Sequence, residues 1–144
     1  MADIDVQPKA FTPSIRVTPP NEWFVKESVT VLAPTGQANV IASSEPLDPQ
    51  ITTEQYAGIQ GQLLDEEFPD YLELSYGPAK VFGGLDGYVR RFEWTPPDGV
   101  PVVQIQLYAV RDERGLTATA TTPRSVYQDY EAELLAILTS LDVT

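Results

Sequence analysis

Apolar and polar residues alternate along the chain from Val100 to Val110, which predicts a β-strand that is buried on one side. A turn at 112–115 and a second extended run at 116–121 follow this strand. Apolar residues then recur at helical spacing as far as Leu141. The last third of the chain therefore predicts a hairpin and a helix that covers one side of a sheet.

The closing helix has a predicted start and a predicted apolar stripe. Thr122 is the expected N-cap, and Pro123 occupies the first helical position, where its missing N–H costs nothing. The stripe consists of Val126, Tyr130, Leu134, Ile137, Leu138 and Leu141. Burial of these side chains would hold the helix on the sheet.

Shorter alternating runs predict further strands, separated by breaks that contain proline and glycine. Thr52 and Gln55 match a capping box, which predicts the start of another helix. Trp23 is expected to plug the core or its edge rather than to hold a ligand. The expected strands before residue 100 are 11–17, 28–33, 38–43, 71–82 and 88–95, and the expected helix is 52–67.

The predicted order is β-β-β-α-β-β-β-β-α, with hairpin links in both blocks of strands. Hairpins join antiparallel strands, and two such blocks separated by a helix indicate an α+β fold rather than a doubly wound parallel one. We predict a single antiparallel sheet of about six to seven strands, flanked by two main helices. Residues 1–10 are expected to form a flexible N-terminus, and residues 11–144 a single domain.

Charge and composition exclude several kinds of partner and site. Nine basic residues stand against twenty-one acidic ones, which gives a formal net charge of −12. A surface of this sign repels phosphate backbones and anionic lipids, so nucleic acid is not expected as a partner. The chain has no cysteine and no histidine, which excludes disulfides, imidazole metal sites and Ser-His-Asp hydrolysis. No cofactor or metal is expected.

The sequence also bears on where the protein resides. No stretch approaches the roughly 20 apolar residues that span a bilayer, so no transmembrane segment is expected. The first residues lack the basic and apolar regions of a signal peptide. We therefore expect a cytoplasmic protein, or a periplasmic or cell-envelope protein if a leader precedes this sequence.

A series of short motifs resembles one bacterial family. The motifs are Pro-Pro-Asn-Glu-Trp at 19–23, Ser-Val-Thr-Val at 28–31, Asn-Val-Ile-Ala-Ser at 39–43, Thr-Thr-Glu-Gln-Tyr-Ala at 52–57, Val-Gln-Ile-Gln-Leu-Tyr at 103–108 and Ile-Leu-Thr-Ser-Leu at 137–141. Over roughly residues 11–141 the chain resembles the DcrB-like family of uncharacterised bacterial domains. That family shares its fold with the photosystem PsbP proteins and the Mog-type Ran-binding proteins.

The resemblance implies an antiparallel sheet flanked by helices, and it also implies a partner. In one branch, the Eag chaperones of type VI secretion, a dimer shelters hydrophobic N-terminal segments of effectors on a concave sheet surface. By this likeness the partner would be a protein or a protein segment, Val29 and Val31 would lie on the groove, and the domain could form a homodimer. Other branches are envelope lipoproteins, whose lipobox cysteine this sequence lacks.

The charged residues that could form an ion-binding site have simpler structural explanations. The acidic run at 65–70 lacks the spacing of a calcium-binding loop and is expected to be a solvated helix end. Arg90 and Arg91 are neighbours on one strand, so they point to opposite faces and cannot form one anion clamp. One of them is expected to pair with Glu73 or Glu93 across the sheet.

An aromatic set leaves two roles open, because it can line an apolar groove on a partly polar sheet face or pack in the core against the closing helix. We expect a partner on the side opposite the closing helix. The candidate residues on these strands are Tyr88, Phe92, Trp94, Gln104, Gln106 and Tyr108.

Three functions remain open. The first is a non-catalytic protein-binding or adaptor domain, with a chaperone for hydrophobic segments of secreted effectors as its most specific form. The second is an exported or lipoprotein-type envelope module. The third is a carboxylate-based enzyme, which would need two acids facing one pocket with separated pKa values. The missing histidine and cysteine favour the first, so we do not expect an enzyme.

Overall fold

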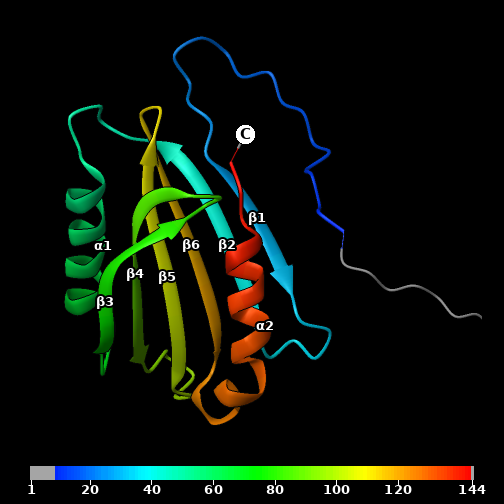
Figure 1. Ribbon diagram of the computed structural model, residues 1–144, viewed down its shortest axis with the longest axis vertical. Coiled ribbons are helices and arrows are strands. Elements are labelled where there is room, and N and C mark those ends of the chain that lie inside the picture. The colour runs from blue at the N-terminus through cyan, green and yellow to red at the C-terminus, as the bar shows by residue number, and fades with distance from the viewer. Residues whose placement is uncertain (1–8, 144) are drawn as a thin grey trace, which may run out of the picture.

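The computed structural model describes residues 9–143, which form six β-strands, two α-helices and a 3₁₀ turn (Figure 1). The strands pair antiparallel in one sheet, in the order β1-β2-β6-β5-β4-β3. The predicted α+β class, with a single antiparallel sheet and two helices, is confirmed. The elements are β1 (Glu27–Leu32), β2 (Asn39–Pro46), α1 (Thr53–Glu67), β3 (Leu72–Val81), β4 (Leu85–Trp94), β5 (Val102–Arg111), β6 (Arg114–Pro123), η1 (Arg124–Val126) and α2 (Tyr127–Ser140).

The strands β3 to β6 form a meander of consecutive hairpins, and β2 pairs with β6. Gly83 and Gly84 turn the chain between β3 and β4 with φ of 82° and 118°, which glycine adopts without strain. Asp112 and Glu113 make the predicted hairpin tip between β5 and β6. The last strand, β6, therefore lies inside the sheet and joins the meander to the β1–β2 hairpin.

The side of the sheet beneath α2 carries the apolar core. Ile105, Leu107 and Ala109 alternate with polar residues of β5 and are buried on this side, as the sequence pattern predicts. α2 packs on β6 and β2, and it lies in front of the sheet in Figure 1. Leu134 and Leu138 of α2 join the same cluster. Its other buried members are Ala38, Val40, Val81, Phe82, Leu116, Ala118 and Ala120.

α1 packs on the opposite side of the sheet, over β4 and β5. Its predicted capping box is confirmed: the Thr52 hydroxyl accepts a bond from the Gln55 N–H at 3.1 Å, and the Gln55 side chain accepts one from the Thr52 N–H at 2.9 Å. The buried residues of the helix are Tyr56, Ala57 and Leu64. Ile59 and Leu63 of the same helix are exposed.

The predicted strand at 11–17 is absent. Residues 9–26 instead form an extended segment, here called the arm, which leaves the start of β1 and runs back outside it (Figure 1). A strand needs a neighbour to pair with, and among residues 9–143 no strand pairs with the arm. Trp23, expected in the core, lies on the arm with 73% of its surface exposed. Residues 1–8 of the expected flexible N-terminus lie outside the described residues.

The predicted start of the closing helix is also wrong. Thr122 is buried on β6, and its hydroxyl donates a hydrogen bond to the Gln37 carbonyl at 3.0 Å. Because that hydroxyl is bonded to the turn between β1 and β2, it caps no helix. η1 comes first, and α2 begins at Tyr127 without a side-chain cap.

Candidate binding surface

The cross-strand register places the predicted partner residues on two sides of the sheet. Val29 and Val31 stand opposite Ala42 and Val40 and point to the α2 side. The other six point to the α1 side: Tyr88, Phe92 and Trp94 from β4, and Gln104, Gln106 and Tyr108 from β5. The structure therefore does not bring the eight residues together in one groove.

Phe92 and Tyr108 belong to the core under α1, since both are 0% exposed. The Tyr56 ring meets Tyr108 edge-on, with ring centres 6.5 Å apart. Phe68 and Tyr71 lie against Phe92 at 6.4 and 5.4 Å. Phe92 and Tyr108 pack in a core and Tyr88 and Trp94 are half-buried, but packing against the closing helix is wrong for all four, because these rings point to the other side.

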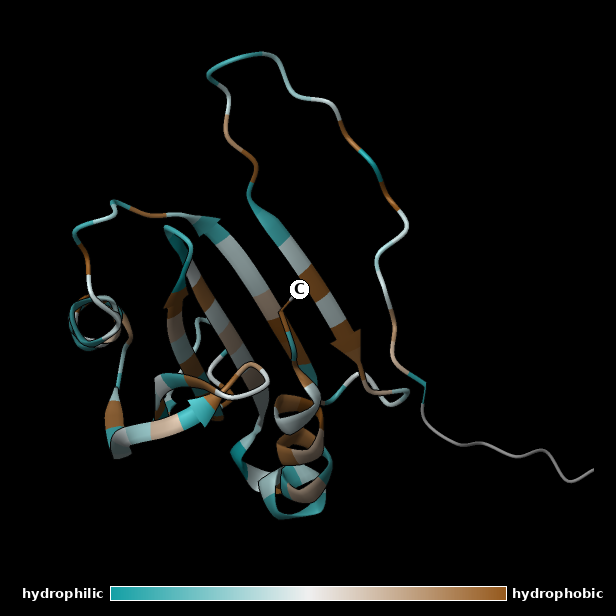
Figure 2. Ribbon diagram, turned by 45° about the horizontal axis from the view of Figure 1, so that its top comes forward, coloured by the Kyte–Doolittle hydropathy of each residue, from teal (hydrophilic) through white to brown (hydrophobic). Residues whose placement is uncertain are grey.

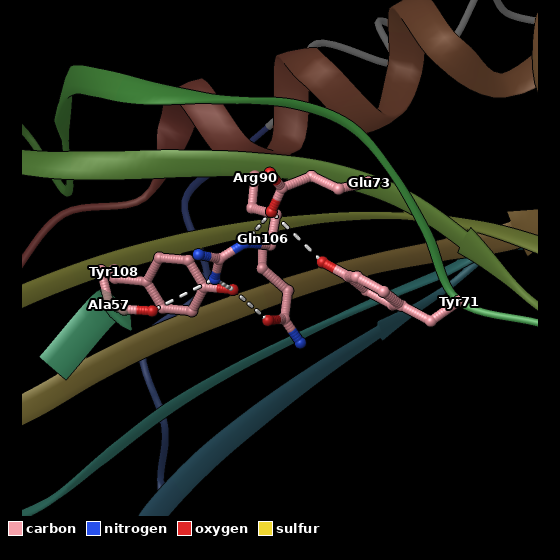
Figure 3. Close-up of polar contacts among 6 residues, drawn as sticks. All are labelled: Ala57, Tyr71, Glu73, Arg90, Gln106 and Tyr108. Carbon is pink, nitrogen blue, oxygen red and sulfur yellow. Dashed lines mark hydrogen bonds and ion pairs between the residues drawn. The ribbon is translucent and has the colours of Figure 1, made fainter. Parts of the chain in front are cut away.

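A buried arginine ties α1 to this side of the sheet (Figure 3). Arg90 is 4% exposed. Its Nε donates to a Glu73 carboxylate oxygen at 2.9 Å, and its Nη1 donates to the Ala57 carbonyl at 3.2 Å and to the Tyr108 hydroxyl at 2.8 Å. The Tyr108 hydroxyl donates in turn to Gln106. The predicted arginine–glutamate pair is therefore confirmed for Arg90 and Glu73.

The surroundings of Arg90 explain why it can be buried. The guanidinium lies 4.2 Å from the centre of the Tyr76 ring, close enough for a cation–π contact. Gly61 leaves room for it, since a Cβ there would come within 2.3 Å of Arg90 Nη2. Burial raises the pKa of Tyr108 well above its usual range, and burial with the nearby Glu73 charge raises the pKa of Tyr71 to about 12. Both phenols therefore keep their protons at physiological pH, and the hydrogen bonds of Arg90 hold α1 on the sheet.

The same side of the sheet is open beyond α1. Because α1 packs on β4 and β5 and reaches Thr117 of β6 through Tyr56, the described residues place no helix over Thr119 and Thr121 of β6 or over this side of β2 and β1. Leu32 is 70% exposed and Ile41 is 43% exposed. We call this surface the open half-face, and it consists of Thr30, Leu32, Asn39, Ile41, Thr119 and Thr121.

α1 supplies apolar side chains at the border of the open half-face. The Tyr56 hydroxyl hydrogen-bonds Thr117 of β6 at 2.7 Å, so this flank of α1 faces β6. Ile59 and Leu63 follow Tyr56 at helical spacing on the same flank, and they are 45% and 42% exposed. The open half-face therefore has a partly apolar wall along one border.

The two predicted glutamines mark that border on the sheet. Gln104 accepts a bond from the Trp94 indole at 2.8 Å and donates one to Thr121 at 2.7 Å. Gln106 donates to Thr119 at 3.2 Å. Both side chains are therefore held in cross-strand bonds. Sequence reasoning missed Leu32 and Ile41, although their register opposite Asn39 and Thr30 would follow from the predicted hairpin.

A pocket of about 510 Å³ lies on the α2 side, near the start of α2. Two acids, Glu93 and Asp129, line it. Arg124 pairs with Glu93 at 3.3 Å, and Arg91 pairs with Glu131 of α2 at 3.1 Å. Residues 9–143 contain no group of three or more acidic side chains placed to hold a metal ion. Three of the charged side chains that line the pocket, Arg91, Glu93 and Arg124, are thus held in ion pairs.

The architecture defines a small α+β domain with one antiparallel sheet and a helix on each side. The sequence model of the DcrB family matches residues 18–140, and the chain belongs to that family. No curated protein sequence matches it.

Solved structures share this fold at low sequence identity. PA94 from Pseudomonas aeruginosa, a protein of unknown function, has a TM-score of 0.71 and 15% identity, over 87% of this chain and 88% of that chain. PsbP from Synechocystis sp. PCC 6803 has a TM-score of 0.58 and 9% identity, over 81% and 82% of the two chains. LpqN from Mycobacterium tuberculosis, involved in cell envelope biogenesis, has a TM-score of 0.55 and 13% identity, over 74% and 62%. The fold is therefore PsbP-like, as predicted.

Within the part of the chain that the structure describes, no helix has the length and apolar character needed to span a membrane.

Proposed function

We propose that this DcrB-family chain is a non-catalytic protein-binding domain, and that an apolar segment of a partner protein docks on the open half-face. The observation that carries the proposal is the half-covered sheet. α1 stops over β5, and Leu32 and Ile41 remain exposed beyond it. Exposed apolar side chains grouped on one surface of a folded protein mark an interaction site.

The chemistry of this surface indicates the kind of segment. Ile59 and Leu63 border it on α1, and the threonines of β6 and β1 supply hydroxyl groups between the apolar residues. The chain carries a net charge of −12, so basic residues flanking the segment would improve complementarity. An apolar N-terminal segment of a secreted effector has the required character, and a chaperone for such segments is the specific form of this proposal.

A binding assay with defined peptides tests this function. Fluorescently labelled apolar peptides of about 20 residues, with and without flanking lysines, are titrated with the protein, and anisotropy is measured. Ile41→Asp should weaken binding at least tenfold, which corresponds to about 1.4 kcal/mol. The matched control is Leu135→Asp, because Leu135 is a similarly exposed residue on α2. Equal binding by the two variants, or no binding of any peptide, would refute the proposal.

An envelope role is the second candidate. It is favoured by the fold shared with LpqN, which is involved in cell envelope biogenesis. Fractionation of the native host, with an antibody against this chain, distinguishes an envelope module from a cytoplasmic adaptor. Recovery in the periplasmic or membrane fraction would favour the envelope module.

The non-catalytic part of the proposal has its own test. Glu93 and Asp129 both line the α2-side pocket, as a carboxylate-based enzyme would need, but Glu93 is engaged by Arg124. If Glu93→Gln and Asp129→Asn variants fail to complement a deletion strain while still binding the peptides, a catalytic role would replace this part of the proposal.

A further inference from the structure

The two edges of the sheet differ in their protection against an added strand. β3 carries a register shift between Glu73 and Ser75, a proline at position 78 and Lys80, all of which discourage further pairing. β1 has no proline, bulge or charge from Ser28 to Leu32. Among the described residues no strand lies on its outer side. The outer edge of β1 can therefore pair with one more strand.

The arm has the sequence of such a strand. Apolar Phe11, Ile15 and Val17 alternate with polar residues at 12, 14, 16 and 18. Alternation over eight residues is the pattern of an edge strand that buries one face. Pro13 is compatible with that position, since proline occurs on edge strands with its missing N–H toward solvent. The arm thus has the residue pattern of a strand that could pair with the outer edge of β1.

The apolar face of the arm is unburied in the single chain. Phe11 is 74% exposed, Ile15 is 91% exposed and Val17 is 68% exposed. Figure 2 shows brown bands in the arm and in β1, with the arm apart from the sheet. Among residues 9–143, no hydrogen bond joins 9–22 to a strand or helix. Such a run of exposed apolar side chains indicates a surface that another protein segment covers.

Charge favours the body of a second copy as that occupant. The arm contains three of the nine basic residues, Lys9, Arg16 and Lys26, and one of the twenty-one acidic ones. Residues 27–144 contain six basic and eighteen acidic residues. A basic arm is therefore complementary to the acidic remainder of an identical chain.

The arm stands apart from its own β1. Arg114 of β6 donates to the Val25 carbonyl at 2.8 Å, and Lys26 pairs with Glu45 at 3.3 Å, which fixes the last residues of the arm to the sheet. Before them the chain turns at Asn21 and Glu22, where the Trp23 N–H bonds to the Pro20 carbonyl at 3.3 Å. Beyond this turn the arm runs outside β1 without pairing to it (Figure 1), whereas a twofold pair would let each arm reach β1 of the other copy.

We propose that two copies of this chain exchange arms, so that residues 11–18 of each pair with the outer edge of β1 in the other. Ile15 and Val17 then lie on the same side as Val29 and Val31, and the polar residues of the arm lie beside Ser28 and Thr30. In this arrangement Val29 and Val31 contact a partner, as the family resemblance implies, and that partner is the arm of a second copy. The exchange uses the outer backbone edge of β1 and the α2-side residues Val29 and Val31, whereas Leu32 and Ile41 of the open half-face lie on the other side of the sheet, so the exchange does not rest on the proposed function.

Engineered cysteines test the exchange directly, because the chain has no cysteine of its own. Separately purified Ile15→Cys and Val31→Cys variants, distinguished by a tag on one of them, are mixed and oxidised mildly. The exchange predicts a disulfide-linked heterodimer on non-reducing gels. The control replaces Val31→Cys with Leu74→Cys, on the protected edge strand β3, and should give at least tenfold less cross-link. In the double variant Ile15→Cys/Val31→Cys, the linked product should be a dimer.

The mass of the unmodified chain provides a second measurement. Light scattering after size-exclusion chromatography should give twice the mass of one chain, and Ile15→Asp/Val17→Asp should give the mass of one chain. Leu72→Asp, an equally drastic change at an exposed residue of β3, should remain dimeric. A monomeric unmodified chain, a cross-link only within one chain, or equal cross-linking to Leu74→Cys would overturn the proposal.

Discussion

The two sides of the sheet are held to their helices in different ways. Under α2 the buried contacts are apolar, with Leu134 and Leu138 packed on Ile105 and Leu107 in one cluster. Under α1 a buried arginine and tyrosine hydroxyls share hydrogen bonds. Apolar packing depends on volume and tolerates exchange of one aliphatic residue for another. A buried polar network depends on each partner, because any group left unpaired is costly.

The largest expected effect comes from a cavity under α2. Leu134→Ala should lower the free energy of unfolding by about 2–5 kcal/mol, because Leu134 is 2% exposed and its neighbours cannot fill the space. Urea denaturation followed by circular dichroism measures this loss. Leu135→Ala, one position along on the exposed surface, should lose less than about 1 kcal/mol. Similar losses in both variants would show that α2 is not seated as described.

The next prediction concerns a substitution that removes the polar contacts of a buried side chain but keeps most of its size. Arg90→Met should cost about 2–4 kcal/mol, since Glu73, Tyr108 and the Ala57 carbonyl each lose a donor. The exposed part of Glu73 can be rehydrated, which limits the loss. Arg91→Met is the control and should cost less than about 1 kcal/mol, because the Arg91–Glu131 pair is partly exposed. The contrast between the two sides would be lost if both variants unfolded at the same urea concentration.

A pair of glycines in α1 gives effects of opposite sign. Gly58→Ala should raise the free energy of unfolding by about 0.5–1 kcal/mol, because nothing lies within 4 Å of the new Cβ and alanine favours the helix. Gly61→Ala should lower it by about 1–2 kcal/mol, because its Cβ displaces the Arg90 guanidinium. Thermal denaturation of the two variants measures both shifts. A stabilising Gly61→Ala would mean that Arg90 does not occupy this position.

The smallest predicted effect is a loss of folding stability that is absent at neutral pH and appears only at alkaline pH. Burial raises the pKa of both Tyr71 and Tyr127 to about 12, from 10.0. A raised pKa means that the folded state holds the proton more tightly, so this stability is complete below pH 10 and is lost as the pH rises toward 12. Burial also raises the pKa of Tyr56, Tyr76 and Tyr108, all on the α1 side.

Alkaline stability should therefore depend mainly on the α1 side. Denaturation at pH 9 and pH 11, with tyrosinate absorbance recorded in parallel, checks this expectation. Tyr127→Phe, on the α2 side, should leave most of the loss between these pH values in place. If that single change abolished the loss, the assignment to the α1 side would be wrong.

Sequence patterns predicted the α2 side better than the α1 side. The alternation of Val103, Ile105 and Leu107 and the helical spacing of Leu134 and Leu138 identify faces directly, because each face is apolar throughout. On β4 both faces are mixed, so the pattern did not show that Arg90 would be buried and Arg91 half-exposed. That outcome depends on Gly61 and Ala57, which approach from a helix remote in sequence.

The limits of prediction at the chain's start have a similar cause. Alternation at 11–17 predicts a strand that the structure does not contain, because pairing requires a neighbour that local pattern does not specify. The family resemblance implies that Val29 and Val31 lie on the groove, and strand period alone does not say whether they share a side of the sheet with the aromatic set. The register between β1, β2 and β6 decides it, and that register joins distant residues.

The position of β6 inside the sheet also sets the order in which the domain can fold. The hairpins from β3 to β6 close short loops, whereas Val40 of β2 stands opposite Ala120 of β6, eighty residues away. Closing that long loop costs more chain entropy than any hairpin of the meander, so the β1–β2 hairpin adds to an already formed β3–β6 meander. Ala120 contributes to the α2 core. The step that completes the sheet therefore also completes the surface on which the last helix comes to rest.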